Sequence, residues 1–78
     1  MNKKKMFLMI TQINDLKNFV EITNKISCNV YAQRNEFIVD AKSLLGILSL
    51  DLTKPLCLIS DEEIPEKIYN ELKVFSVE

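Results

Sequence analysis

Two spacings of apolar residues alternate along the chain and divide it into short segments. Residues 6–10 form a brief, continuously apolar run, which favours a strand because a helix of that length would be marginal. Apolar side chains then recur at helical spacing, at Leu16, Phe19, Val20, Thr23 and Ile26. The pattern predicts a strand within residues 4–11, then a helix that begins after an Asn14 N-cap and ends near Ser27.

The next segment changes to the two-residue alternation that is typical of a strand. In residues 28–34, Cys28, Val30 and Ala32 fall on one side and more polar residues fall on the other. Arg34-Asn35 predicts a hairpin turn, because asparagine tolerates the positive φ that tight turns demand. We expect the returning strand over residues 36–40.

A short apolar segment that follows Ser43 carries the most information. Ser43 stands directly before this apolar run. Its hydroxyl is therefore predicted to accept a hydrogen bond from a backbone N–H two or three residues later and so to cap a helix. Nearly every residue from 44 to 50 is apolar, and a chain of 78 residues cannot enclose all sides of such a helix. Part of this surface should face solvent or a partner, and both core packing and docking remain open.

The last third of the chain predicts one strand and one helix. Pro55 opens a strand, and the apolar run at 56–59 indicates a central strand that is covered on both faces. Residues 60–63 turn the chain, and Pro65 suits the first turn of a closing helix. The apolar stripe of that helix comprises Ile64, Ile68, Leu72 and Phe75. Residues 76–78 are expected to fray or to lie against the sheet.

The resulting order of elements is βαββαβα, without repeats, linkers or low-complexity segments. This order predicts an α+β fold in which a four-stranded antiparallel sheet carries three helices on one face and is partly open to water on the other. We expect one domain over residues 1–78, which buries only about 60% of the surface that its unfolded form exposes.

Charge and composition exclude several classes of function. The net charge is −1 and the basic run is confined to residues 3–5, so we expect neither nucleic acid nor an anionic membrane surface as a partner. The apolar runs are far shorter than the roughly 20 residues of a membrane span, and no cleavage pattern of small residues follows the basic start. We expect a cytoplasmic protein with no membrane insertion.

Residues that could carry chemistry are scarce. The chain has no histidine, which removes imidazole acid–base catalysis, imidazole metal ligands and phosphohistidine chemistry together. Cys28 and Cys57 lack metal-ligand spacing, and Cys57 is expected in a buried strand, where its thiolate is disfavoured. The acidic run at 61–63 is typical of a polar loop before a helix. We predict no enzyme activity, no metal site and no cofactor.

The segment Asp40-Ala41-Lys42-Ser43-Leu44-Leu45-Gly46-Ile47-Leu48-Ser49-Leu50 and the order of elements resemble HPr, the phosphocarrier of the bacterial phosphoenolpyruvate:sugar phosphotransferase system. The family pattern is a Lys-Ser pair, two bulky apolar residues, a glycine, two more apolar residues and Ser-Leu, and residues 42–50 match it position by position. Residues 25–41 fit the second and third family strands without a gap. The resemblance implies the open-faced βαββαβα sandwich of HPr.

The carrier site of the family is not matched. HPr proteins bear phosphate on a histidine at the start of the first helix, in a His-x-Arg-Pro pattern that adds a guanidinium and helix N-terminal amides. A gap-free count back from Ser43 places Gln12 at the histidine, Asn14 at the arginine and Asp15 at the proline. The carboxylate of Asp15 would repel an incoming phosphoryl group. Histidine phosphocarrier activity is therefore excluded for this chain acting alone.

The regulatory and docking positions of HPr are matched. Ser43 aligns with the serine that a dedicated kinase phosphorylates in HPr of low-GC Gram-positive bacteria, which adds about −1.5 to −2 charge. Alternatively, Ser43 serves only as a helix cap. Leu44, Leu45 and Leu48 align with the apolar patch by which HPr docks on its partners. The resemblance implies a bacterial regulatory or protein-interaction module, with phosphotransferase-system components of sugar transport or an HPr kinase as partners.

An alternative from a different class is a small-molecule-binding regulatory domain of the ACT type, whose βαββαβ order is close. Such domains usually approach their ligand with a glycine-bearing loop after the first strand. Gly46 is the only glycine of this chain, and it lies in the second predicted helix.

Overall fold

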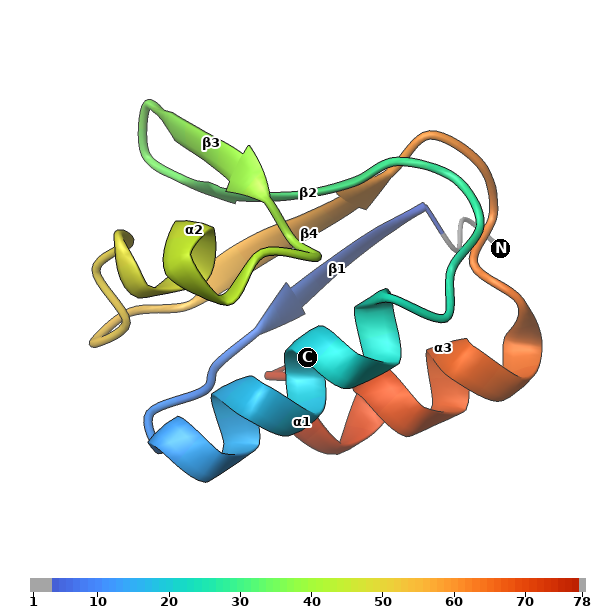
Figure 1. Ribbon diagram of the computed structural model, residues 1–78, viewed down its shortest axis with the longest axis horizontal. Helices are drawn as coiled ribbons and strands as arrows, with labels where there is room; N and C mark the ends of the chain where they lie inside the picture. Colours follow the sequence, from blue (N-terminus) through green and yellow to red (C-terminus); the bar gives the residue numbers. More distant parts are fainter. Residues whose placement is uncertain (1–3, 78) are drawn as a thin grey trace.

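The computed structural model describes residues 4–77 and confirms the predicted βαββαβα order. The elements are β1 (Lys5–Leu8), α1 (Ile13–Thr23), β2 (Val30–Arg34), β3 (Phe37–Asp40), α2 (Leu44–Leu48), β4 (Leu56–Ser60), α3 (Glu66–Leu72) and a 3-10 helix, η1 (Lys73–Phe75). Figure 1 follows the chain through these elements from blue to red.

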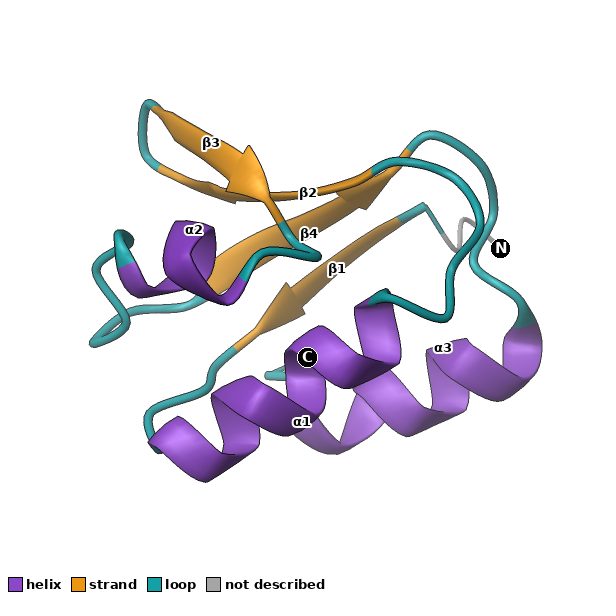
Figure 2. Ribbon diagram, viewed as in Figure 1, coloured by secondary structure: helices purple, strands orange, loops and turns teal. Residues whose placement is uncertain are grey.

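The four strands form one sheet in the order β1-β4-β2-β3, and every neighbouring pair is antiparallel. The helices cover one face, where α1 and α3 lie side by side (Figures 1 and 2). The predicted α+β fold, with its antiparallel sheet and central β4, is therefore confirmed.

The prediction that β4 is covered on both faces is wrong. Leu56 and Leu58 point into the core, but Cys57 and Ile59 are only half-buried on the opposite face of the sheet. On that face Cys57 stands between Phe7 of β1 and Gln33 of β2, and Phe7 is 45% exposed. The reason is that the helices cover a single face of the sheet. The side chains that each strand directs to the other face are therefore open to water.

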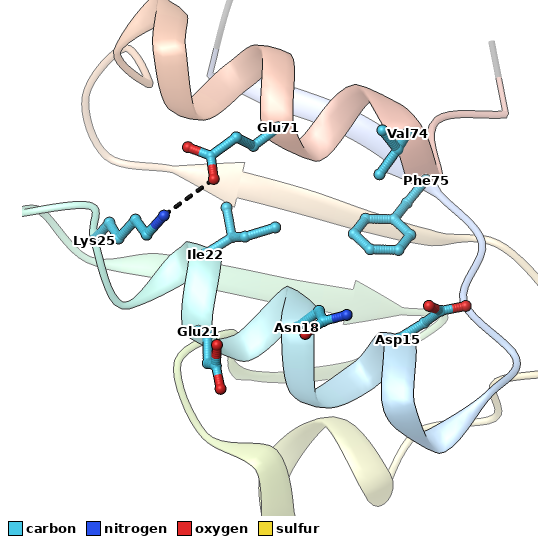
Figure 3. A pocket seen from close by; sticks show the side chains of 8 residues that line it. All are labelled: Asp15, Asn18, Glu21, Ile22, Lys25, Glu71, Val74 and Phe75. Carbon is cyan, nitrogen blue, oxygen red and sulfur yellow. Dashed lines mark hydrogen bonds and ion pairs between the residues drawn. The ribbon is translucent and has the colours of Figure 1, made fainter.

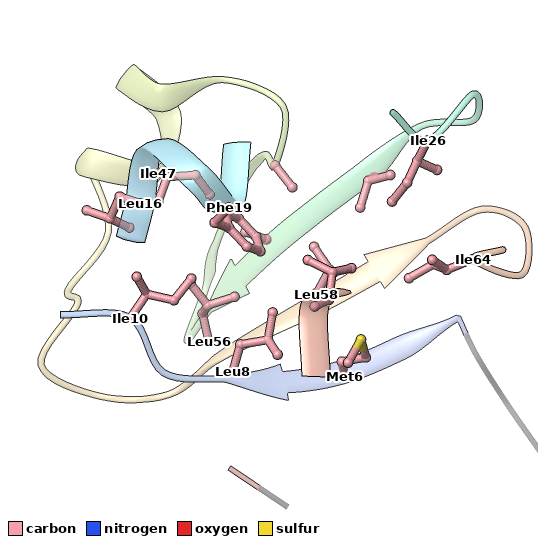
Figure 4. Packing of buried hydrophobic residues seen from close by; sticks show 14 of the residues in the cluster. Met6, Leu8, Ile10, Leu16, Phe19, Ile26, Ile47, Leu56, Leu58 and Ile64 are labelled. Atoms are coloured by element: carbon pink, nitrogen blue, oxygen red, sulfur yellow. The ribbon is translucent and has the colours of Figure 1, made fainter. Parts of the chain in front are cut away.

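The core lies between the sheet and the helices. Leu8, Leu56 and Leu58 of the sheet and Phe19 of α1 are all enclosed in it (Figure 4). The ring of Phe19 meets the ring of Phe75 edge to face, with centroids 6.3 Å apart and an interplanar angle of 82°. The helical stripe that the sequence predicted for α1 thus supplies the centre of the core.

The predicted ends of α1 need correction. The residue that precedes the helix is Gln12, whose backbone is extended and whose side chain makes no capping bond, and Asn14 lies exposed in the first turn. The predicted Asn14 cap is therefore wrong, because the helix begins one residue before it, at Ile13. The helix also ends at Thr23 and not near Ser27, since the Thr23 and Asn24 side chains bond to a distant loop.

The predicted hairpin is present, but its turn comprises residues 35–36 and not Arg34-Asn35, and the returning strand begins at Phe37 and not at residue 36. The chain end lies against the sheet, which is one of the two placements expected from the sequence. Asn35 has φ 56° in the two-residue turn that joins Arg34 to Phe37. Residues 75–77 lie against the outer edge of β1, where Met9 N–H donates to the Phe75 carbonyl at 3.0 Å and Val77 N–H donates to the Phe7 carbonyl at 3.1 Å. Residue 78 lies outside the described residues.

Within residues 4–77, no helix is long and apolar enough to cross a membrane. The same residues contain no group of His, Cys, Asp or Glu side chains that could hold a metal ion. Cys28 and Cys57 are both of intermediate burial.

Candidate functional site

Ser43 caps α2, as the sequence predicted. Its backbone is extended, with φ −108° and ψ 116°, and its Oγ accepts from the Gly46 N–H at 3.1 Å. The Ser43 carbonyl accepts the first helical bond, from the Ile47 N–H at 3.0 Å. Ser43 is half-buried, so part of the residue is accessible to solvent.

The loop before Ser43 is anchored to the end of α1. The buried Thr23 Oγ1 donates to the Ala41 carbonyl at 2.8 Å, and Asn24 Nδ2 donates to the Lys42 carbonyl at 3.1 Å. In return, the Lys42 ammonium donates to the Ile26 carbonyl at 2.5 Å. Sequence reasoning missed these anchors, although a threonine in the apolar stripe of α1 was a signal for a buried hydroxyl that needs a partner.

We expect Thr23→Val to destabilise the protein by about 1–3 kcal/mol, because the variant keeps the shape but leaves the buried Ala41 carbonyl without a donor. Urea unfolding followed by circular dichroism measures the change. Ser49→Ala is the matched control, since the Ser49 hydroxyl donates to the Gly46 carbonyl at an exposed site. A loss within about 0.5 kcal/mol for Thr23→Val would show that the anchor contributes nothing.

Gly46 lets α2 approach the sheet closely. A Cβ on this residue would lie 3.3 Å from the Asp40 carbonyl oxygen and 3.4 Å from the Val39 Cβ. The first contact is tighter than side chains normally accept, so the glycine is explained by close packing of α2 on the end of β3. This packing fixes which residues of α2 face inward.

The apolar residues of α2 divide between core and solvent. Ile47 is fully buried and points into the core, as does Leu16 of α1 (Figure 4). Leu45 is 81% exposed, Leu48 is 43% exposed and Leu44 is half-buried. We call Leu44, Leu45 and Leu48 the α2 patch. Part of α2 does face solvent, as expected, and its use for docking stays a prediction.

The start of α1 carries another exposed apolar side chain. Ile13 is 49% exposed and lies one turn before Leu16. Gln12 and Asn14 are exposed, and Asp15 is half-buried. At the end where HPr carries its histidine, this chain therefore presents two neutral amides, a carboxylate and an isoleucine.

The carboxylate of Asp51, which follows α2 in the chain, has a lowered pKa. Hydrogen bonds from the Thr53 hydroxyl at 2.5 Å and the Thr53 amide at 3.0 Å lower the pKa of Asp51. The nearby charges of Arg34 and Lys54 act in the same direction. Asp51 is fully exposed. Its hydrogen bonds with Thr53 stabilise the connector that follows α2.

A groove of about 500 Å³ lies between α1 and α3 (Figure 3). Its rim carries Asp15, Glu21 and Glu71, and its wall includes the ring of Phe75. Lys25 spans the groove and pairs with Glu71 at 3.0 Å. The groove could not be predicted from the sequence, because its walls come from two helices that are distant in the chain.

Comparison with known proteins connects this geometry to a fold. No protein-family model and no curated protein matches the sequence. Among solved structures, the chain is similar to the crystal structure of HPr-C-His from Thermoanaerobacter tengcongensis, with a TM-score of 0.73 and 22% identity over 88% of this chain and 85% of that chain. The likeness shows that the chain has the HPr-like fold, as the resemblance of its sequence implied.

Proposed function

We propose that the protein is a regulatory or protein-interaction module related to the carriers of the bacterial phosphoenolpyruvate:sugar phosphotransferase system, and that it acts in the cytoplasm through the α2 patch. The main supporting observation is the 81% exposure of Leu45 on a helix that is otherwise fixed by its cap and by buried Ile47. An apolar surface held this rigidly loses little conformational freedom when a partner covers it.

The residues at the start of α1 support a role other than phosphate transfer. A carrier needs a nucleophile there, and the Gln12 amide is not one. The half-buried Asp15 carboxylate would repel a phosphoryl donor. A module of this kind binds a partner protein of the phosphotransferase system but does not transfer phosphate.

We further propose that Ser43 is a site of regulatory phosphorylation. Its half-buried hydroxyl precedes the α2 patch directly, so a phosphate would add charge beside Leu44 and Leu45. Charge at the margin of an apolar interface disfavours docking through the cost of desolvation. Phosphorylation of Ser43 would then weaken binding through the patch.

We also propose that the chain has no enzyme activity of its own. The acidic residues at 61–63 are exposed in the turn after β4, where the Ser60 hydroxyl donates to the Glu62 carbonyl at 2.5 Å. That contact supports a structural role for the turn. The ACT-type alternative has no observation in its favour, because residues 9–12 after β1 contain no glycine and Gly46 packs against β3.

Replacement of Leu45 by glutamate tests the docking proposal. Titration of labelled protein with enzyme I of the phosphotransferase system should give saturable binding, and Leu45→Glu should weaken it at least about tenfold because a charge enters the centre of the patch. Val74→Glu is the matched control, since Val74 is 76% exposed beyond α3. Equal affinities for the two variants, or no binding at about 1 mM, would contradict the proposal.

A kinase assay tests the second part. HPr kinase should add one phosphate to the wild-type chain, and Ser43→Ala should abolish the addition while Ser49→Ala retains it, because Ser49 closes the other end of α2. Intact-protein mass spectrometry and fragmentation locate the phosphate. A kinase preparation that modifies HPr and never this chain would restrict Ser43 to its capping role.

A further inference from the structure

α2 is too short to hold a fixed orientation by itself. It spans five residues, and a helix of that length is unstable in water without tertiary contacts. Of residues 44–48, Ile47 alone is buried, while Leu45 is 81% exposed. The direction in which α2 presents Leu45 therefore depends on how residues 41–43, the loop that leads into the helix, are held.

Every backbone N–H and C=O group of residues 41–43 has a hydrogen-bond partner. The three N–H groups donate to β2, to the Asp40 carboxylate and to the Asp40 carbonyl. The three carbonyls accept from the Thr23 hydroxyl, from the Asn24 amide and from an N–H of α2. Because two of these donors are side chains at the end of α1, that helix takes part in fixing the entry to α2.

Lys42 and Asn24 bond the loop and α1 to each other from both sides. The Lys42 ammonium donates to the Ile26 carbonyl at 2.5 Å, just beyond α1. The last turn of α1 contains no basic residue, so Lys42 supplies the positive charge that the C-terminal end of a helix favours. In the other direction, Asn24 Nδ2 donates to the Lys42 carbonyl at 3.1 Å and to the Val20 carbonyl at 2.7 Å. We call the Lys42–Ile26 and Asn24–Lys42 hydrogen bonds the clasp.

We propose that Asn24 and Lys42 are positioning residues for docking, because the clasp ties residues 41–43 to α1 and so fixes the direction in which α2 presents Leu45. This inference rests on the docking role proposed above for the α2 patch. Neither residue belongs to the patch, so each acts through the helix. When the clasp is open, α2 leaves its docking orientation, and the apparent affinity falls in proportion to the closed fraction.

Hydrogen exchange on the free chain tests the clasp without a partner. Lys42→Met keeps the aliphatic stem and removes the donor, so the Gly46 and Ile47 amides, which are bonded to the cap of α2 in the wild-type chain, should lose almost all of their protection. Exchange at the Ser60 amide of β4 should not change. Lys25→Met is the matched control, because the Lys25 ammonium is exposed and pairs with α3.

Titration with enzyme I then connects the clasp to docking. Lys42→Met should bind at least about threefold more weakly than the wild-type chain, which corresponds to a closed fraction of about one third or less. Asn24→Ala should also weaken binding, since it removes the other half of the clasp. Lys42→Arg should restore the affinity, because a guanidinium can donate to the same carbonyl, and Lys25→Met should bind as the wild-type chain does.

Other results would overturn the proposal. Protected Gly46 and Ile47 amides in Lys42→Met would show that the clasp does not hold α2. Equally faster exchange at Ser60 would mean that Lys42 contributes only to global stability. Unprotected α2 amides with unchanged affinity would separate the clasp from docking. A wild-type chain that does not bind enzyme I would instead refute the docking role on which the proposal rests, and exchange on the free chain would still show whether the clasp fixes α2.

Discussion

Phe19→Ala is expected to cost about 3–5 kcal/mol of unfolding free energy, the usual range for removing a fully enclosed aromatic ring. Phe19 is 0% exposed, and its ring meets the ring of Phe75 edge to face between α1 and η1. The total stability of so small a domain is roughly 5 kcal/mol. The variant should therefore lie close to its unfolding midpoint in the absence of denaturant.

Urea titration at low protein concentration, followed by far-ultraviolet circular dichroism, measures this loss. Phe37→Ala is the matched control, because it removes the same ring from a site that is 70% exposed. The control should change the unfolding free energy by less than about 0.5 kcal/mol. Similar losses for the two variants would mean that Phe19 does not occupy the core as described.

The fold could be predicted where local pattern decides it. The apolar stripe of α1 identified Leu16 and Phe19 as core residues, and the positive φ of Asn35 followed from the turn chemistry of asparagine. The end of α1 could not be predicted, because Thr23 and Asn24 bond to a loop 18 residues further along the chain. Hydrogen bonds between residues so far apart in the chain produce no periodic pattern in the sequence.

A continuous apolar run also left the burial of β4 ambiguous. Leu58 is fully enclosed and its neighbour Cys57 is half-buried, although both lie within the same run. Periodicity cannot distinguish a strand covered on one face from a strand covered on both when the open face also carries apolar residues. The difference depends on where the helices pack, which is a property of the whole fold.

The candidate site was likewise predictable only where residues close together in sequence determine it. The Ser43 cap could be predicted, because it depends on residues three apart in sequence. The sequence also predicted that part of α2 is exposed, but it could not separate Leu45 from Ile47, since that depends on how Gly46 seats α2 against β3. The edge position of β3 was equally out of reach, because strand order is set by non-local pairing.

The wild-type chain should gain no mass when it is incubated with phosphoenolpyruvate and enzyme I, whereas Gln12→His/Asn14→Arg should gain one phosphoryl group. Gln12 stands at the entrance of α1, so a histidine there would supply the missing nucleophile and an arginine at 14 would offset the Asp15 carboxylate. Both positions are exposed, and neither side chain makes a capping bond that the substitutions would break.

Intact-protein mass spectrometry and the acid lability of phosphohistidine provide the readout for this pair of proteins. Asn18→His is the matched control, because it places an exposed imidazole on the same helix but away from its start. Acid-labile phosphate on the wild-type chain would overturn the proposal that it is not a carrier. If the double variant bound enzyme I through Leu45 and still gained no phosphate, the assignment of Gln12 to the histidine position would be wrong, because docking and nucleophile would both be present without transfer.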